Sequence, residues 1–267
     1  SYFSNYSSAI NCYSEALDLA RNIKNKKVES FCLTNISVIL SRLGCYERSI
    51  DYLQEAHDID KQIGNIKFAY LSLNNLADAF LNKGLVLSNK TDLYKAFDYL
   101  TEAIDSANRS GVKKAQLIAL NNMGNIQLHL GYYYSAQNSF QAALKIAEEF
   151  QDQEALIKGL EDLGMCSLGA RNYEKAQKYF EEAIKRGGQI GLKEVLWEPL
   201  FYLGKCYEEK LTYNQALASY KDSINAIEHI RSGVIPDYYK VEFGKNKLKV
   251  YDSIIDLLLM LSENDPS

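Results

Sequence analysis

Apolar and small side chains recur along the chain at steps of three and four residues, the spacing of one buried face of an α-helix. A frame of large, small, large and small positions also returns at longer intervals, with a period of forty residues through the second half. Such a period is typical of a repeat solenoid. The copies of this packing frame are Tyr6, Ala9, Tyr13, Ala16; Tyr46, Ser49, Leu53, Ala56; Leu93, Ala96, Leu100, Ala103; Tyr133, Ala136, Phe140, Ala143; Tyr173, Ala176, Phe180, Ala183; and Tyr213, Ala216, Tyr220, Ser223.

The packing frame predicts an all-α chain built from helix pairs. Gly64, Gly111 and Gly191 fall at one phase of the repeat, where a glycine with positive φ can end a helix. The chain opens at the second helix of a pair, so we expect its natural N-terminus upstream. The predicted elements are a lone second helix at 5–23, helix pairs at 27–63, 67–110, 113–150, 153–190 and 193–231, which make one solenoid over 1–231, and a C-terminal capping or connector segment at 232–267 whose helix spans 237–262.

Two places depart from the regular pattern. The step from Tyr46 to Leu93 is seven residues too long, and we expect the extra residues, 85–91, to lengthen the turn between two helices. Their apolar part, 85–87, either packs on a neighbouring repeat or contacts a partner. Pro199 interrupts another predicted helix, which therefore either begins near Glu198 or is kinked.

The stretch from Leu120 to Ala143 resembles the tetratricopeptide repeat (TPR). It carries a large apolar residue, an apolar–glycine pair, Gly-x-Tyr, and then alanine, an aromatic residue and alanine in the family's order. The TPR is usually thirty-four residues long, so these repeats are of an extended kind. The resemblance implies a right-handed superhelix of about 5.5 helix pairs plus a capping helix, with a concave groove that binds proteins or peptides.

The C-terminal helix is apolar on more than one face. Covering the last repeat uses one face, so we expect the other to meet a further domain or a second copy of the chain. The segment 227–231, followed by Phe243, Lys247, 250–252 and 255–258, resembles the connector between TPR arrays and CHAT domains, which are caspase-like proteases. This resemblance implies a regulatory arm of a CHAT-type protease.

Composition gives no sign of a nucleic-acid or membrane partner. The net charge is −4 and the pI is near 5.6, which produces no general attraction to nucleic acid or anionic lipid. No apolar run approaches the ~20 residues of a membrane span. Five cysteines without a CxxC motif favour a reducing compartment, and we expect a cytoplasmic protein.

No set of residues predicts catalysis. His57, His129 and His229 lie in three different repeats, and the chain has no HExxH motif and no phosphate-binding glycine loop after a strand. We therefore predict a protein that is not an enzyme and that needs no metal or cofactor.

Candidate binding residues lie on the face of each first helix that the packing frame leaves free. TPR arrays line their concave groove with this face, and three successive repeats place an asparagine there. A carboxamide both donates and accepts, so a ladder of them can hold the main chain of a peptide. Alternatively, these asparagines bond between neighbouring first helices or to water. The predicted groove residues are Asn35, Arg42, Asn75, Asp78, Asn82, Asn122, Asn125, His129, Asp162, Tyr202 and Lys205.

The leading hypothesis is a non-enzymatic scaffold that binds a protein or peptide in this groove. Asn35, Asn75 and Asn122 match positions at which TPR proteins such as kinesin light chain and the chaperone-binding clamps hold a ligand. The paired basic residues of the clamps are lacking, because Arg42 and Lys205 lie several repeats apart. The alternative is a peptide-sensing regulator that resembles the Rap and LGN-type TPR proteins.

Overall fold

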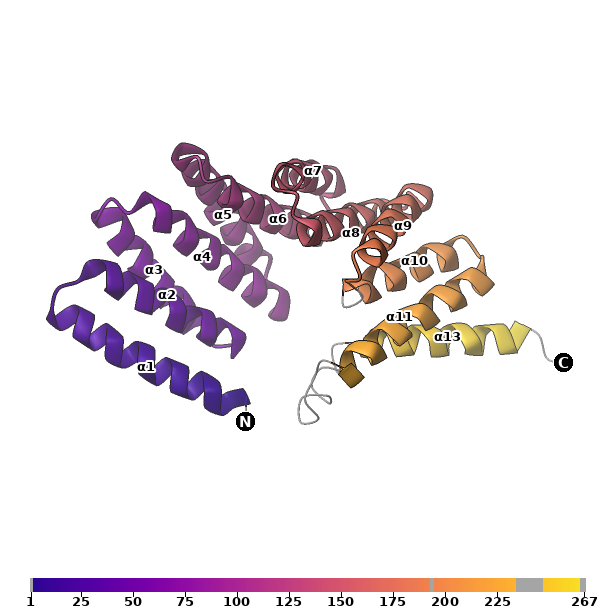
Figure 1. Cartoon of the computed structure of the whole chain (residues 1–267), viewed down its shortest axis with the longest axis horizontal. Coiled ribbons are helices and arrows are strands. Elements are labelled where there is room, and N and C mark those ends of the chain that lie inside the picture. The colour runs from indigo at the N-terminus through magenta and orange to yellow at the C-terminus, as the bar shows by residue number, and fades with distance from the viewer. Residues whose placement is uncertain (1, 193–194, 234–246, 265–267) are drawn as a thin grey trace. The chain divides into compact units, whose positions relative to one another are not determined.

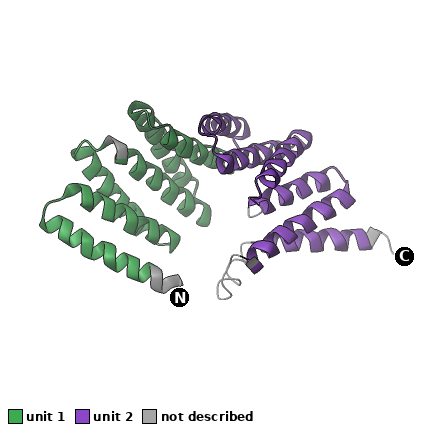
Figure 2. Cartoon of the chain, in the orientation of Figure 1, with its two compact units in different colours: residues 1–130 green, residues 131–267 purple. Residues whose placement is uncertain are grey.

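The structure is a computed structural model that describes residues 2–192, 195–233 and 247–264 (Figure 1). Within these ranges the chain forms twelve α-helices and no β-strand, which confirms the predicted all-α class. The helices form two compact units, residues 1–130 and 131–267 (Figure 2). No helix of the described ranges is long and apolar enough to cross a membrane.

Unit 1 contains six helices joined by short turns. Gly64 and Gly111 end helices with φ values of +66° and +67°, as predicted from their repeat phase. Turns of two or three residues bring consecutive helices side by side as antiparallel hairpins. The helices are α1 Tyr2–Asn22, α2 Lys26–Arg42, α3 Tyr46–Gln62, α4 Ile66–Val86, α5 Lys90–Ser110 and α6 Lys113–His129.

The seven extra residues lengthen two helices, so the prediction of a longer turn is wrong. α4 continues through Val86 and α5 begins at Lys90, which leaves only 87–89 between them. Both helices have 21 residues, against 17 in α2 and α3. In a helix the backbone N–H and C=O groups bond to one another, whereas in a loop many of them would have to bond to water. Leu85, Val86 and Leu87 are all exposed, so the first of the two alternatives, packing on a neighbouring repeat, is not seen in the described residues.

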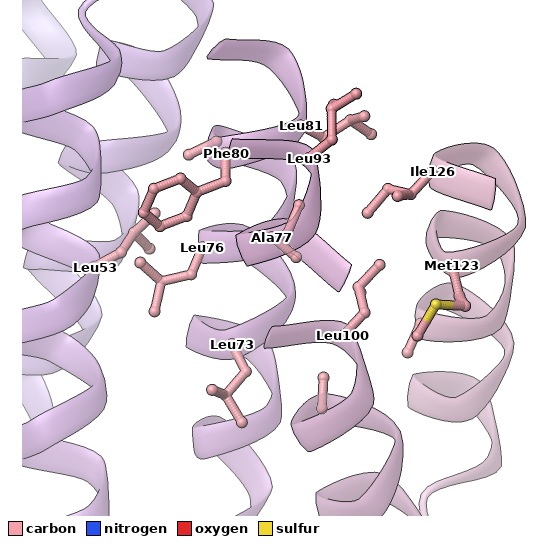
Figure 3. Close-up of a cluster of buried hydrophobic side chains, with 14 of the residues drawn as sticks. Leu53, Leu73, Leu76, Ala77, Phe80, Leu81, Leu93, Leu100, Met123 and Ile126 are labelled. Carbon is pink, nitrogen blue, oxygen red and sulfur yellow. The ribbon is translucent and has the colours of Figure 1, made fainter. Parts of the chain in front are cut away.

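The core of unit 1 lies between first and second helices of successive pairs. Figure 3 shows leucines of α3, α4 and α5 and two apolar side chains of α6 pointing toward one another. Leu53, Leu73, Leu76, Leu100 and Ile126 are each 1% exposed or less. Because this cluster joins three helix pairs, unit 1 is stabilised by contacts between neighbours as well as within pairs.

Unit 2 repeats the arrangement and adds a final helix. Its frame residues Phe140, Phe180 and Tyr220 are completely buried, as are their alanine neighbours Ala136 and Ala176. The packing frame therefore identifies true core positions. The helices are α7 Tyr133–Phe150, α8 Gln153–Gly169, α9 Tyr173–Gln189, α10 Trp197–Glu209, α11 Tyr213–Gly233 and α13 Leu248–Asn264.

α10 is shorter than predicted because of Pro199. The predicted helix began at 193, but residues 193–194 lie outside the described ranges and α10 begins at Trp197. Pro199 is the third residue of α10, within the first turn, whose N–H groups have no partner inside the helix. Of the two alternatives, the one in which the helix begins near Glu198 is confirmed.

The C-terminal helix α13 has one buried and one exposed apolar face. Val250 and Leu257 are buried in a cluster with side chains of α10 and α11. Leu248, Ile255, Leu258 and Leu259 are exposed. The predicted start at 237 and Phe243 of the connector resemblance lie outside the described residues. In the described part, α13 thus covers α11 with only one of its apolar faces.

Two of the cysteines, Cys166 and Cys206, pack as small apolar side chains in the core. Cys166 and Cys206 lie forty residues apart and are buried at equivalent places in α8 and α10. Burial raises the pKa of both thiols to about 12, so neither is a reactive thiolate near neutral pH.

A buried charge cluster lies on α8. Lys158 Nζ is 2.9 Å from Glu161 Oε1 and 3.3 Å from Asp162 Oδ1, and both carboxylates are almost fully buried. Burial raises the pKa of Glu161 to about 7, against the attraction of Lys158, and the nearby Glu198 carboxylate acts in the same direction as burial. The pKa of Asp162 is also raised, mainly by burial.

The tight contact between a glycine and an aromatic ring gives a test of the packing. A Cβ on Gly164 would lie 2.5 Å from Phe180 Cε1, whereas the helical Gly188 has no neighbour within 4 Å. We expect Gly164→Ala to lower the free energy of unfolding by about 1–3 kcal/mol through overpacking. Gly188→Ala should be neutral or stabilising by up to ~1 kcal/mol, because alanine favours helix. Urea unfolding measures both, and equal effects of the two substitutions would refute the contact.

The buried carboxylates predict a pH-dependent stability. In the folded chain the pKa of Glu161 lies above its ordinary value of 4.5, so the carboxyl keeps its proton to a higher pH than in the unfolded chain. The free energy of unfolding should therefore fall as pH rises from that value toward about 7, and level off above it. Thermal unfolding should show a lower midpoint at neutral than at mildly acidic pH.

Glu161→Gln should reduce this dependence, because the amide does not ionise, although Asp162 still contributes in the same direction. Glu174→Gln changes an exposed carboxylate on α9 and serves as the matched control, which should keep the wild-type dependence. An unchanged slope in Glu161→Gln would argue against the buried cluster as its source.

Candidate functional site

Two adjoining cavities lie along α2 and α4 in unit 1, and together they form what we call the α2–α4 groove. One has a volume of about 560 Å³ and the other of about 360 Å³. They share Val38 and Asn75, so the groove is continuous. The larger is lined by Lys27, Val28, Ser30, Phe31, Thr34, Asn35, Val38, Asp60, Asn65, Phe68, Leu71 and Asn75, and the smaller by Val38, Ser41, Arg42, Tyr46, Ser49, Leu53, Asn75, Asp78 and Asn82.

The smaller cavity brings four of the predicted residues together. Asn82 Nδ2 donates to Asp78 Oδ2 over 3.2 Å, while Arg42 and Asn75 complete the polar lining. Desolvation by the cavity walls raises the pKa of the Asp78 carboxyl, against the hydrogen bond from Asn82 and the charge of Arg42. Within the described residues the Arg42 guanidinium makes no hydrogen bond or ion pair. The cavity therefore places the Arg42 guanidinium, a donor without a partner among the described residues, opposite the Asp78 carboxylate, an acceptor.

The larger cavity has an apolar end that the sequence reasoning missed. Val28, Phe31, Phe68 and Leu71 line it and are 39%, 51%, 45% and 36% exposed. The signal was present in the sequence. Phe31 and Val28 lie four and seven residues before Asn35, and Leu71 and Phe68 stand in the same relation to Asn75, so they continue the same helix faces.

Asparagine side chains occupy the middle of the groove. Asn75 lines both cavities and makes no hydrogen bond within the described residues. Asn35 donates from Nδ2 to the carbonyl oxygen of Phe31 over 2.8 Å, which fixes its orientation on α2. Since an amide of this kind both donates and accepts, Asn75 is free to bond a peptide group.

The predicted residues on α6 do not line the α2–α4 groove. Asn122 Nδ2 donates to Asn74 Oδ1 over 3.0 Å, so this asparagine bonds between neighbouring first helices, as the alternative interpretation proposed. Asn125 is half-buried, and His129 is exposed at the last residue of the helix.

The remaining predicted residues lie in unit 2. Asp162 is buried in the α8 charge cluster and presents almost no surface. Tyr202 and Lys205 line a cavity of about 430 Å³ with residues of α8, α10 and the start of α9. Tyr202 stacks on Phe180 at 5.8 Å, and Lys205 Nζ lies 3.1 Å from Glu208 Oε2. These side chains have partners of their own, unlike Arg42 and Asn75.

Comparison with known sequences supports the repeat interpretation. The family profile described as "Tetratricopeptide repeat" matches residues 115–187. A second profile, described as "Anaphase-promoting complex subunit 5", matches residues 1–83. No curated protein sequence shows significant similarity to the chain.

Solved structures share the fold at low identity. BtubC (BKLC) from P. vanneervenii is 14% identical with a TM-score of 0.73, over 87% of this chain and 94% of that one. A Rap protein in complex with competence and sporulation factor is 16% identical with a TM-score of 0.64, over 91% and 68%. A STAND ATPase with a tetratricopeptide repeat sensor from Pyrococcus horikoshii is 18% identical with a TM-score of 0.59, over 88% and 38%. The repeats, the helix packing and these similarities show that the chain folds as a tetratricopeptide repeat solenoid.

Proposed function

We propose that the chain is a non-catalytic scaffold that binds a protein or peptide segment in the α2–α4 groove. The observation that carries this proposal is the pairing of exposed apolar side chains with unpaired polar groups along one continuous groove. A binding site typically combines an apolar surface with a few polar groups that fix orientation. The fold alone supports the same class of function, since solenoids present extended surfaces to partners.

The groove dimensions fit a short extended segment. Phe31 and Arg42 are eleven residues apart on α2, which corresponds to roughly 16 Å along the helix. An extended peptide covers that length in about five residues. We therefore expect a ligand with an apolar side chain near Phe31 and Phe68 and polar or main-chain groups about five residues away, near Arg42.

The polar end is suited to a peptide group. Arg42 can donate to a carbonyl oxygen while Asp78 accepts from an N–H, and Asn75 can do either. Because the two charges oppose each other, the cavity has no strong preference for an acidic or a basic ligand. Side chains that bind the main chain of a peptide place few requirements on the peptide's sequence.

A peptide-sensing regulator is the second candidate. The similarity to a Rap protein that was solved with competence and sporulation factor supports it, although at 16% identity this similarity extends to the fold alone. In this version, the bound peptide changes how the chain meets another partner. A change in small-angle scattering on peptide binding would favour sensing over passive scaffolding.

A regulatory arm of a CHAT-type protease is a more specific version of the scaffold. The exposed face of α13, with Ile255 and Leu258, would meet a following domain or a second copy of the chain. Tyr251 Oη donates to Glu228 Oε1 over 2.6 Å and holds the two parts of the connector resemblance together. A parent reading frame that encodes no histidine and cysteine protease domain downstream would exclude this version.

Substitutions in the groove test the proposed function. Peptides selected on the chain from a random library should bind Phe68→Ala and Asn75→Ala at least roughly tenfold more weakly, through loss of apolar contact and of hydrogen bonds. Fluorescence anisotropy measures the dissociation constants. Both side chains are at least partly exposed, so circular dichroism should show unchanged helix content.

Matched controls separate groove binding from surface adhesion. Tyr134→Ala removes an exposed aromatic ring on α7, and Asn108→Ala removes an exposed amide on α5, both outside the groove. These variants should bind the selected peptides as the wild type does. Peptides that lose affinity equally for control and groove variants would contradict the proposal.

A further inference from the structure

A lysine of the C-terminal helix lies among three aromatic rings of α10. Lys249 Nζ is 5.6 Å from the ring centroid of Trp197, and 5.2 Å from those of Phe201 and Tyr202. A cation within about 6 Å of a ring centroid is attracted by the negative face of the ring. We call Trp197, Phe201 and Tyr202 the aromatic cage.

The packing of unit 2 holds the rings of the cage in place. Trp197 and Phe201 are one helical turn apart, and so lie on the same side of α10. Tyr202 meets Phe201 edge-on at 5.1 Å and also stacks on Phe180 at 5.8 Å. Phe201 is itself buried against Tyr220. Phe201 and Tyr202 are fixed by these contacts, and Trp197 packs, partly buried, against the same core cluster, so the cage does not depend on Lys249 for its shape.

Rings and one hydroxyl hold the ammonium, without a counter-ion. Lys249 Nζ donates to Tyr202 Oη over 3.3 Å, and no carboxylate in the described residues lies within ion-pair distance of it. Lys205 shows the contrast, since it lies over the Tyr220 ring but also pairs with Glu208. Lys247 Nζ also lies over the Trp197 ring, at 5.1 Å from its centroid. A cage that satisfies a cation in this way is the arrangement that recognises quaternary ammonium groups.

The side chain of Lys249 can leave the cage while α13 stays in place. Lys249 is exposed, whereas its neighbour Val250 is completely buried and anchors the helix together with Leu257. A lysine side chain changes rotamer on a flexible four-carbon stem. An external cation therefore needs to displace that side chain, and the ammonium of Lys247 where it covers Trp197, while the apolar contacts of α13 remain.

We propose that the aromatic cage is a binding site for a quaternary ammonium group, which Lys249 occupies from within the chain. A primary ammonium is compact and strongly hydrated, so it gives up much hydration to enter the cage. A trimethylammonium group places methyl groups against the rings and gives up less. The group can belong to a trimethylated lysine of a protein or to a small choline-like molecule. This site is separate from the α2–α4 groove and does not depend on it.

The single tryptophan of the chain makes the site directly observable. Trp197 is the only tryptophan in 267 residues, so its emission reports on the cage alone. The probes are choline, trimethyl-lysine amide, a peptide with one trimethyl-lysine, and the uncharged isostere 3,3-dimethylbutanol, at constant ionic strength. We expect a saturable change in emission with the three cations and none with the alcohol. Tighter binding of the peptide than of choline would identify a protein as the source, and the reverse a small molecule.

Substitution of Lys249 tests whether it competes for the site. Lys249→Ala should lower the apparent dissociation constant of choline roughly tenfold, because the internal occupant is lost. Tyr202→Leu should raise it, because one wall is lost. Lys221→Ala, which changes an exposed lysine on α11, should leave it unchanged, and circular dichroism checks that each variant is folded.

Three results would overturn the proposal. The first is an equal response to choline and to the uncharged alcohol, which would show apolar adhesion only. The second is no saturable response in folded Lys249→Ala. The third is the same dissociation constant in wild type and Lys249→Ala, which would show that the cations bind elsewhere.

Discussion

Unit 2 depends on the close approach of an aromatic ring to a helix backbone that carries no side chain at that point. Phe180 lies against Gly164 and Tyr220 against Gly204, so α9 rests directly on α8 and α11 on α10. Small residues beside the rings, such as Ala176 and Ala183, keep the separation short. Protein interiors tolerate little excess volume, and this contact therefore fixes how the pair is oriented. The chain then grows by stacking pairs on their neighbours.

Packing of this kind uses only part of each first helix and leaves the rest to solvent. In unit 1 the free face is not uniformly polar, because Phe31, Phe68 and Leu71 are exposed next to Asn75. Apolar surface that no core requires, beside polar groups without partners, is typical of a binding surface. The same periodicity that builds the core thus also gathers these side chains in one groove.

In unit 2 the free surfaces have a different character on the same scaffold. On α8 two buried carboxylates pair with an exposed lysine, and on α10 three rings surround a lysine from α13. The α8 cluster contains no residue of the packing frame, and the aromatic cage uses the frame residues Phe180 and Tyr220 only to support its rings. Fold and function are therefore carried by different positions, as expected where one architecture supports many activities.

The sequence by itself determined the helices, their pairing and most core positions, because the helical period of 3.6 residues and the repeat period of forty residues can both be read directly from the order of apolar and small residues. The same periodicity also predicted that Arg42, Asn75, Asp78 and Asn82 share a surface. It did not find the apolar end of the groove, although Phe31 and Leu71 continue the same faces. Nor did it predict that the extra residues 85–91 would lengthen two helices.

Only the tertiary structure decided which polar side chains stay free. Asn75 and Asn122 are alike in sequence position, yet Asn122 bonds to Asn74 on another helix while Asn75 has no partner in the described residues. Asp162 is equivalent in phase to both, and it is buried against Lys158. Lys249 reaches the rings of α10 from 47 residues beyond Tyr202. Such contacts depend on how distant helices pack, and the local periodicity of a sequence does not encode them.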